Sequence, residues 1–359
     1  MKTRKILSHI FGLAGLAILV GAWAVFGPLV KGALSVKQLD EGLYYMEFKG
    51  DDGFEGLVRS GGGRSSLEIS RYILRFLSKG FAKGQETEEV ADAYGCAAFT
   101  VRDPENRFMM GRNFDFSEST AMILHSRPRD GYESIATFNL RFLGFGEDWK
   151  PDSFANKYMA LSCLFVSLDG MNEKGLAIAD LMAGDDAETH QDRGKPDLTT
   201  TSALRYVLNR AATVDEAIAL LESIDMHSDI GTAHHYAISD ASGHSVVVEY
   251  IDGEMVVTDT PIVTNHYLAE SRYGYGLIPG DNRYDILEDE YVEYLGVFDN
   301  DSLRNAMEKV SQTPSGSFAG TQWTVLMNLE DLTATYYLRR NFDKAYSFKL
   351  GKGKRAISD

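Results

Sequence analysis

The chain contains two cysteines, and their surroundings differ. Cys163 lies in the apolar run Tyr158–Val166, part of an expected buried strand, and a buried free cysteine is usually inert. Cys96 is followed by Arg112 and then by Asp115. An arginine beside a thiol favours the thiolate, which is the nucleophilic form of cysteine. Cys96 is therefore the candidate for nucleophilic chemistry.

A β-hairpin is expected to bring these side chains together. The short apolar segment Cys96–Val101 is followed by the turn Asp103–Asn106, and Arg107–Gly111 leads out again. Arg112 and Asp115 would then return to the start of the first strand. An α-amino group has a pKa of about 7.7–8.0, so an N-terminal Cys96 could pass its thiol proton to its own amine. The alternative is an ordinary surface arginine and aspartate in a turn.

A series of short motifs follows Cys96. They are Gly111-Arg-Asn-Phe-Asp115, Asn172-Glu-Lys-Gly-Leu176, Val263-Thr-Asn265, Pro279-Gly-Asp-Asn-Arg283 and Thr321-Gln-Trp-Thr324. In this order, across Cys96 to about Tyr337, they resemble the choloylglycine hydrolase and penicillin V acylase family. Acid ceramidase and N-acylethanolamine acid amidase are similar relatives that also carry a leader before the cysteine.

The resemblance implies a role for each matching residue. Cys96 would be the nucleophile and, through its own amine, the general base. Asp115 would hold that amine, and Arg112 would lie against the sulfur. Asn265 would donate a side-chain N–H to the oxyanion, and Arg283 would complete the polar network. The implied reaction is hydrolysis of a linear N-acyl amide of the bile-salt, penicillin V or fatty-acyl class, without metal or cofactor; transfer of the acyl group to another acceptor stays open.

The chain departs from the family pattern at two places. Met182 stands where the family usually has Asn or Tyr. We expect its backbone N–H to serve as an oxyanion donor and its side chain to alter the substrate pocket. Ala97-Ala98 stand where Thr or Ser commonly follows the cysteine, which changes the local hydrogen bonding but not the nucleophile.

The resemblance also implies a precursor. An amine locked in the Gly95–Cys96 peptide bond cannot accept a proton, so autocatalytic cleavage at this bond is expected. Before it, Leu67–Phe81 has apolar residues at helical spacing behind the capping pair Ser65-Ser66, and Lys83–Asp92 reads as an exposed linker. The helix would either cover the acyl pocket until release or remain packed as a small subunit.

The N-terminus and the overall charge limit the location and the partners. Lys2, Arg4 and Lys5 precede the uncharged, mostly apolar stretch Ile6–Val30, which is typical of an export signal and long enough to span a bilayer. We expect residues 1–35 to be a signal peptide or membrane anchor, 36–95 a propeptide-like segment and 96–359 the catalytic domain outside the cytoplasm. A net charge of −16 argues against nucleic acid as a partner. A homo-oligomer stays open.

The order of the expected elements indicates an α+β fold. Expected strands after the hairpin are Met159–Leu168, Leu176–Leu181, His235–Ser239, Ser245–Tyr250, Glu254–Asp259, Gln322–Asn328 and Thr333–Leu338; expected helices are Thr199–Ala212, a helix capped by Thr213, and Ser302–Val310. Strands, then helices, then strands favour a layered α+β domain. The resemblance makes this the four-layer αββα sandwich of N-terminal nucleophile (Ntn) hydrolases.

Three other interpretations compete. A papain-like protease would pair Cys96 with His234 or His235, but such cysteines usually begin a helix rather than a strand. A metal site would use His227, Asp229, His234 and His235, whose spacing matches no compact site. An anchored envelope domain with a decayed site would not need the full set of matching polar residues.

Overall fold

The computed structural model describes residues 23, 26–80, 95–144, 149–183, 187–229, 232–278, 280–316 and 318–351. Residues 26–35 are helical. The other helices are α2 (Phe54–Arg59), α3 (Ser66–Leu77), α4 (Phe154–Met159), α5 (Thr200–Arg210), α6 (Val214–Glu222), α7 (Arg283–Glu293) and α8 (Asn300–Lys309), with the short 3-10 helices η1 (Leu140–Leu143), η2 (Ala160–Leu164) and η3 (Glu270–Arg272).

Two β-sheets carry the fold. The nine-stranded sheet has the order β1 (Lys37–Asp40), β2 (Leu43–Gly50), β5 (Ala121–Pro128), β6 (Ser134–Asn139), β7 (Asp169–Asn172), β8 (Ala177–Met182), β11 (His234–Ser239), β12 (Ser245–Ile251) and β13 (Glu254–Asp259). The six-stranded sheet has the order β14 (Ile262–Val263), β3 (Gly95–Arg102), β4 (Phe108–Asp115), β15 (Thr321–Asn328), β16 (Thr333–Leu338) and β17 (Asn341–Lys349). A separate parallel pair joins β9 (Asp197–Thr199) and β10 (Asp225–His227).

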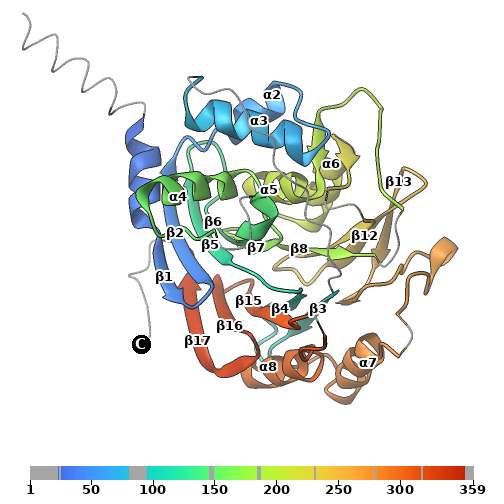
Figure 1. Cartoon of the computed structure of the whole chain (residues 1–359). Coiled ribbons are helices and arrows are strands. Elements are labelled where there is room, and N and C mark those ends of the chain that lie inside the picture. The colour runs from blue at the N-terminus through green and yellow to red at the C-terminus, as the bar shows by residue number, and fades with distance from the viewer. Residues whose placement is uncertain are drawn as a thin grey trace, which may run out of the picture.

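The sheets lie face to face between helices (Figure 1). Helices α2, α3, α5 and α6 lie over the nine-stranded sheet, and α7 and α8 lie under the six-stranded sheet. The order helix, sheet, sheet, helix confirms the predicted αββα sandwich. Because each sheet buries both faces, its central strands are buried along nearly their whole length.

The predicted hairpin is present as β3 and β4. Asp103 closes its turn, because the Asp103 carboxylate accepts the backbone N–H groups of Glu105 and Arg107 at 2.9 and 2.8 Å. In the resulting register, Gly95 lies opposite Asp115, and Ala98 lies opposite Arg112. The hairpin thus returns both charged residues toward the start of β3, as expected.

The segment before the hairpin is built into the same sandwich. β2 pairs in parallel with β5 from Leu43–Ala121 to Gly50–Pro128, and β1 adds the sheet's edge. In α3, Ser65 caps the helix as predicted by accepting the backbone N–H of Glu68. The predicted helix reached Phe81, whereas α3 ends at Leu77; Phe81 itself and the linker 83–92 lie outside the described residues.

One strand prediction is wrong. In the apolar run Met159–Leu168, Met159 ends α4, Ala160–Leu164 form the 3-10 helix η2, and residues 165–168 belong to no helix or strand. Ser153 starts α4 by accepting the backbone N–H of Asn156. The run is buried on all sides, and a continuous apolar run does not separate a buried strand from a buried helix. The next strand is β7, which begins at Asp169, directly after the run.

Other predictions hold with small shifts. The expected helices appear as α5, α6 and α8, and Thr213 caps α6 by accepting the backbone N–H of Glu216. The predicted strand that ends at Leu338 is not the last one, because β17 follows it. No helix in the described part of the chain is both long and apolar enough to cross a bilayer, and residues 1–22, where the export signal is expected, lie outside that part.

Candidate active site

Cys96 lies at the beginning of β3, between the two sheets, and is completely buried. It is paired with Phe114 on β4, and its sulfur accepts a hydrogen bond from Arg112 Nη2 at 3.3 Å. Arg112, two residues before Phe114 on the same strand, is also fully buried. The structure therefore places the predicted guanidinium on the predicted nucleophile.

Arg112 is held by groups from both sheets. Its Nη2 also donates to the backbone carbonyl of Asp180 at 2.9 Å, and its Nε lies 3.3 Å from the Asp169 carboxylate. The indole N–H of Trp323 donates to the same Asp169 oxygen at 2.8 Å. The Arg112 guanidinium also lies over the Phe114 ring, 4.8 Å from its centroid. These contacts fix the guanidinium before any substrate is present.

Asp115 lies beside the Gly95–Cys96 bond and is fully buried. Its carboxylate accepts Arg283 Nη1 at 2.9 Å and the hydroxyl of Thr321 at 2.5 Å. Arg283 Nη1 also donates to the backbone carbonyl of Cys96 at 3.0 Å. The two predicted residues Asp115 and Arg283 therefore form an ion pair that contacts the backbone of Cys96.

Asn265 completes the cluster just beyond β14. Its Oδ1 accepts the backbone N–H of Cys96 at 2.6 Å and Arg283 Nη2 at 2.8 Å. Because both groups can only donate, the amide orientation is fixed, with Nδ2 on the other side. Nδ2 donates one of its two protons to the carbonyl of Met182 at 2.8 Å. The other proton is the one that could serve an oxyanion.

Met182 ends β8 opposite His234 and so lies at the site, as expected. Its observed contact is the carbonyl that accepts from Asn265. The use of its backbone N–H as an oxyanion donor stays a prediction.

Burial controls the protonation of the nucleophile in this uncleaved chain. It raises the pKa of the Cys96 thiol to about 12, although the Arg112 guanidinium acts in the opposite direction. Burial also raises the pKa of Asp115, opposed chiefly by the charge of Arg283 and the hydroxyl of Thr321. Cys96 is thus a neutral, enclosed thiol at ordinary pH.

Cys163 is buried in η2, and burial raises the pKa of its thiol as well. The charge of Arg205 opposes this rise, but no side chain among the described residues donates a hydrogen bond to the Cys163 sulfur, as Arg112 does to that of Cys96. Its assignment as an inert core cysteine stands on this difference.

The histidines do not support the competing sites. The side chain that bonds the Cys96 sulfur is Arg112, not an imidazole, and Cys96 begins a strand. The residues considered for a metal have separate partners, which are Asp197 for His227, Asp180 for His234, Glu249 for His235 and Thr201 for Asp229. Within the described ranges, no group of three or more His, Cys, Asp or Glu side chains is placed to hold a metal ion.

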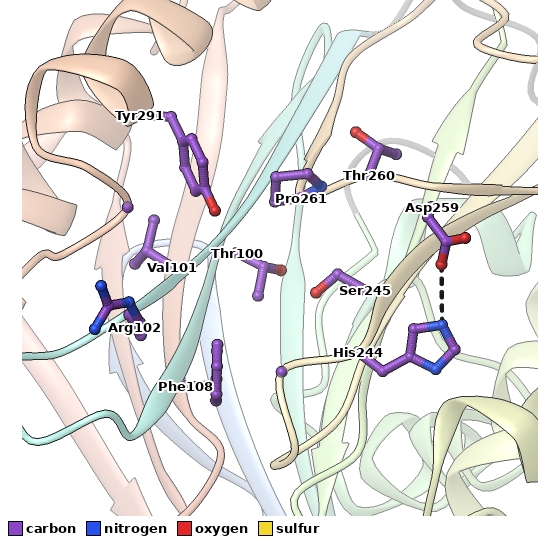
Figure 2. Close-up of a pocket in the computed structure, with 12 residues that line it drawn as sticks. Thr100, Val101, Arg102, Phe108, His244, Ser245, Asp259, Thr260, Pro261 and Tyr291 are labelled. Atoms are coloured by element: carbon purple, nitrogen blue, oxygen red, sulfur yellow. Dashed lines mark hydrogen bonds and ion pairs between the residues drawn. The ribbon is translucent and has the colours of Figure 1, made fainter.

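A groove of about 310 Å³ lies at the other end of β3 (Figure 2). Its walls include Thr100, Phe108, Tyr291 and the hydrogen-bonded pair His244–Asp259. None of its lining residues belongs to the Cys96 network, and a rise of about 3.3 Å per residue puts Thr100 roughly 13 Å along the strand from Cys96. We do not assign this groove to catalysis.

Sequence reasoning missed three residues of the site. Thr321 and Trp323 lie in the late motif that carried part of the resemblance, but no role was assigned to them. Asp169 lies three residues before the Asn172 motif and meets Arg112 only because the two sheets stack. The sequence signal that could have found Asp169 is a carboxylate within a buried strand, because a buried carboxylate needs a cationic partner.

Comparison with known proteins agrees with the geometry. Residues 96–321 match the family model of linear amide C–N hydrolases, choloylglycine hydrolase family. A penicillin V acylase from Pectobacterium atrosepticum is 26% identical over 222 residues, which are 54% of this chain and 57% of that relative. The match thus spans little more than half of that relative's length.

Solved structures give the same fold at lower identity. Two variants of the conjugated bile acid hydrolase from Clostridium perfringens align at 19% identity with TM-scores of 0.53 and 0.55, over 72% of this chain and 93% and 94% of theirs. The penicillin V acylase from Agrobacterium tumefaciens aligns at 21% identity with a TM-score of 0.50, over 72% of this chain and 87% of its own.

The two stacked sheets between helices are those of the Ntn-hydrolase fold, and the family match covers residues 96–321. The chain belongs to the choloylglycine hydrolase family.

Proposed function

We propose that this chain is the precursor of a cysteine amidohydrolase that is activated by cleavage between Gly95 and Cys96. The observation that carries the proposal is the hydrogen bond from the Cys96 backbone nitrogen to Asn265 Oδ1, at 2.6 Å. The nitrogen that cleavage would turn into a free amine already lies among Asp115, Asn265 and Arg283.

Cleavage would use the Cys96 sulfur. The sulfur attacks the Gly95 carbonyl carbon, a C–S bond forms, and the C–N bond to Cys96 breaks while its nitrogen receives the thiol proton. The product is a thioester and a free amine. Water then cleaves the thioester, which leaves the Gly95 carboxylate and restores the thiol.

The freed amine then supports hydrolysis of the substrate. It accepts the thiol proton, and the sulfur attacks the acyl carbon of the amide. The free N–H of Asn265 and the Met182 backbone N–H would stabilise the oxyanion, where one donor is worth about 3–4 kcal/mol. The Cys96 ammonium gives its proton to the leaving amine, and water, deprotonated by the same amine, releases the acid from the thioester.

The space around Gly95 supports this cleavage site. A Cβ at this position would lie 2.7 Å from the Gln312 amide nitrogen and 3.2 Å from an oxygen of Asp115. Any larger residue would therefore press on the ion pair that holds Cys96, so glycine leaves the scissile carbonyl open to the sulfur.

We expect Gly95→Val to slow precursor cleavage by roughly ten-fold or more, because the added methyl groups overpack the site and hinder attack at the carbonyl. The measurement is a time course of the 264-residue fragment that begins at Cys96, by intact mass, beside release of free amine from a panel of N-acyl amides. Activity per mole of free Cys96 should match the wild type, because the large fragment is unchanged. Full turnover by a demonstrably uncleaved precursor would refute the N-terminal nucleophile mechanism.

We also propose that the N-terminal segment remains bound after cleavage. β2 lies inside the nine-stranded sheet, and Phe48 and Phe54 are buried in the common core. Polar contacts add to this, since Arg64 forms ion pairs with Asp192 and Asp197. These contacts support a segment that stays packed as a small subunit over a segment that covers the acyl pocket and is then released.

The two fragments should co-elute in native buffer and separate only in denaturant. Phe48→Asp, which places a charge in the core from β2, should cause loss of the large fragment from the soluble fraction. Lys49→Asp on the same strand is the control, since Lys49 is exposed, and should have little effect. Elution of an active large fragment alone would contradict the proposal.

A small cavity lies under α3, on the aromatic side of the site. It measures about 40 Å³, which is room for little more than a water molecule, and its lining combines Ile69 and Phe142 with the polar Thr201 and Asp229. Phe142 meets the ring of Phe114, the residue opposite Cys96, at a centroid distance of 6.4 Å. The cavity therefore does not define the substrate, and the proposed acyl class, a bile-salt, penicillin V or fatty-acyl amide, rests on the family and its relatives.

The proposal includes a location outside the cytoplasm. It rests on the basic residues before the apolar stretch Ile6–Val30, which resemble an export signal or membrane anchor.

A further inference from the structure

Asn265 lies where the β-ladder has ended. β14 pairs with β3 only through Ile262 and Val263, and the residues from Thr264 to Ala269 belong to no strand or helix. A functional group on such a segment is held less precisely than one on a strand, unless other contacts fix the backbone.

One buried pair provides those contacts. His235 on β11 and Glu249 on β12 lie directly opposite each other, with Nδ1 and Oε1 3.1 Å apart, and both are fully buried. His235 Nε2 lies 2.8 Å from the carbonyl oxygen of Thr264. The two Glu249 oxygens accept the backbone N–H groups of Leu268 and Ala269 at 2.9 and 2.7 Å. The pair therefore holds the chain on both sides of the oxyanion residue.

The hydrogen bonds also fix the number of protons. The Thr264 carbonyl can only accept, so His235 Nε2 carries a proton. The contact between Nδ1 and the carboxylate needs a second proton. Although burial opposes ionisation of Glu249, its hydrogen bonds and the charge of His235 hold its pKa below the ordinary value. The pair therefore holds one proton between Nδ1 and Oε1 in addition to the one on Nε2.

We propose that the His235–Glu249 pair positions Asn265 for oxyanion stabilisation. By fixing Thr264 on one side and Leu268 and Ala269 on the other, the pair keeps the Asn265 amide between the Cys96 nitrogen and the Met182 carbonyl. Neither member of the pair touches the sulfur in the structure, so both are positioning residues. This inference rests on the proposed amidase function.

The test compares His235→Leu with His235→Gln in the cleaved protein. The substrate is an N-acyl amide that the wild type hydrolyses, and kcat and KM are determined separately. His235→Leu should lower kcat by roughly 10- to 100-fold with little change in KM, because a displaced oxyanion donor affects the transition state. His235→Gln should recover part of kcat, because its amide N–H can donate to Thr264.

His125→Leu is the matched control. His125 is another buried histidine, on β5, and it is hydrogen-bonded at 2.7 Å to Glu133, which directly precedes β6. Its loss should lower the melting temperature but leave kcat unchanged. If His235→Leu does not fold, Glu249→Gln keeps the size of the side chain and should show a smaller loss of kcat.

The outcomes separate this inference from the proposed function. Unchanged kcat in a folded His235→Leu variant, or an equal loss in the His125→Leu control, would overturn the positioning role. If the cleaved wild type hydrolysed no N-acyl amide at all, the proposed function would fail, and the positioning role would fail with it.

Discussion

Cys96→Ala is expected to abolish both precursor cleavage and amidase activity, because one sulfur is proposed to perform both reactions. The substitution removes only the sulfur from the buried site, and Arg112, Asp115, Asn265 and Arg283 keep their other contacts. The protein should therefore accumulate as the folded, uncleaved chain. Intact mass and free-amine release measure the two losses independently.

Cys163→Ala is the matched control. It also removes a buried thiol, but Cys163 lies in η2, away from the ion pairs around β3 and β4. We expect normal cleavage and normal turnover, with a modest loss of stability from the small cavity. A folded Cys163→Ala variant without activity, together with an active Cys96→Ala variant, would show that the nucleophile is misassigned.

The sequence predicts best those parts of the fold that local chemistry determines. The β3–β4 hairpin follows from the turn residues after Val101, and α6 follows from the cap at Thr213. Apolar runs that are buried on all sides carry no such signal. Met159–Leu168 was therefore predicted as a strand, although Ser153 caps a helix just before it.

The residues of the candidate site also fall into two groups, those that a local sequence pattern brings together and those that meet only because the two sheets stack. Cys96, Arg112 and Asp115 come together through the short hairpin register, which their spacing indicates. Asp169 and the His235–Glu249 pair act through the stacking of two sheets, so no local pattern places them. The positions of Asn265 and Arg283 came from the resemblance alone, and the structure brings both to Cys96.

Asp115→Asn is expected to lower turnover by roughly two to four orders of magnitude while the protein still folds, because it removes the charge that we propose orients the freed Cys96 amine as a proton acceptor. The fold should survive because Arg283 keeps a second carboxylate partner, Asp281, at 2.7 Å.

Asp281→Asn is the matched control for this change. It also removes a carboxylate from Arg283, but Asp281 bonds Arg283 and not the Cys96 strand in the structure, so its loss should reduce turnover far less. The pH dependence distinguishes orientation of the amine from general destabilisation. A nearby carboxylate raises the pKa of an ammonium group, so its removal in Asp115→Asn should move the acidic limb of kcat/KM to lower pH, whereas Asp281→Asn should leave that limb nearly in place. A pH–rate profile and a turnover close to wild type in folded, cleaved Asp115→Asn would remove Asp115 from the mechanism.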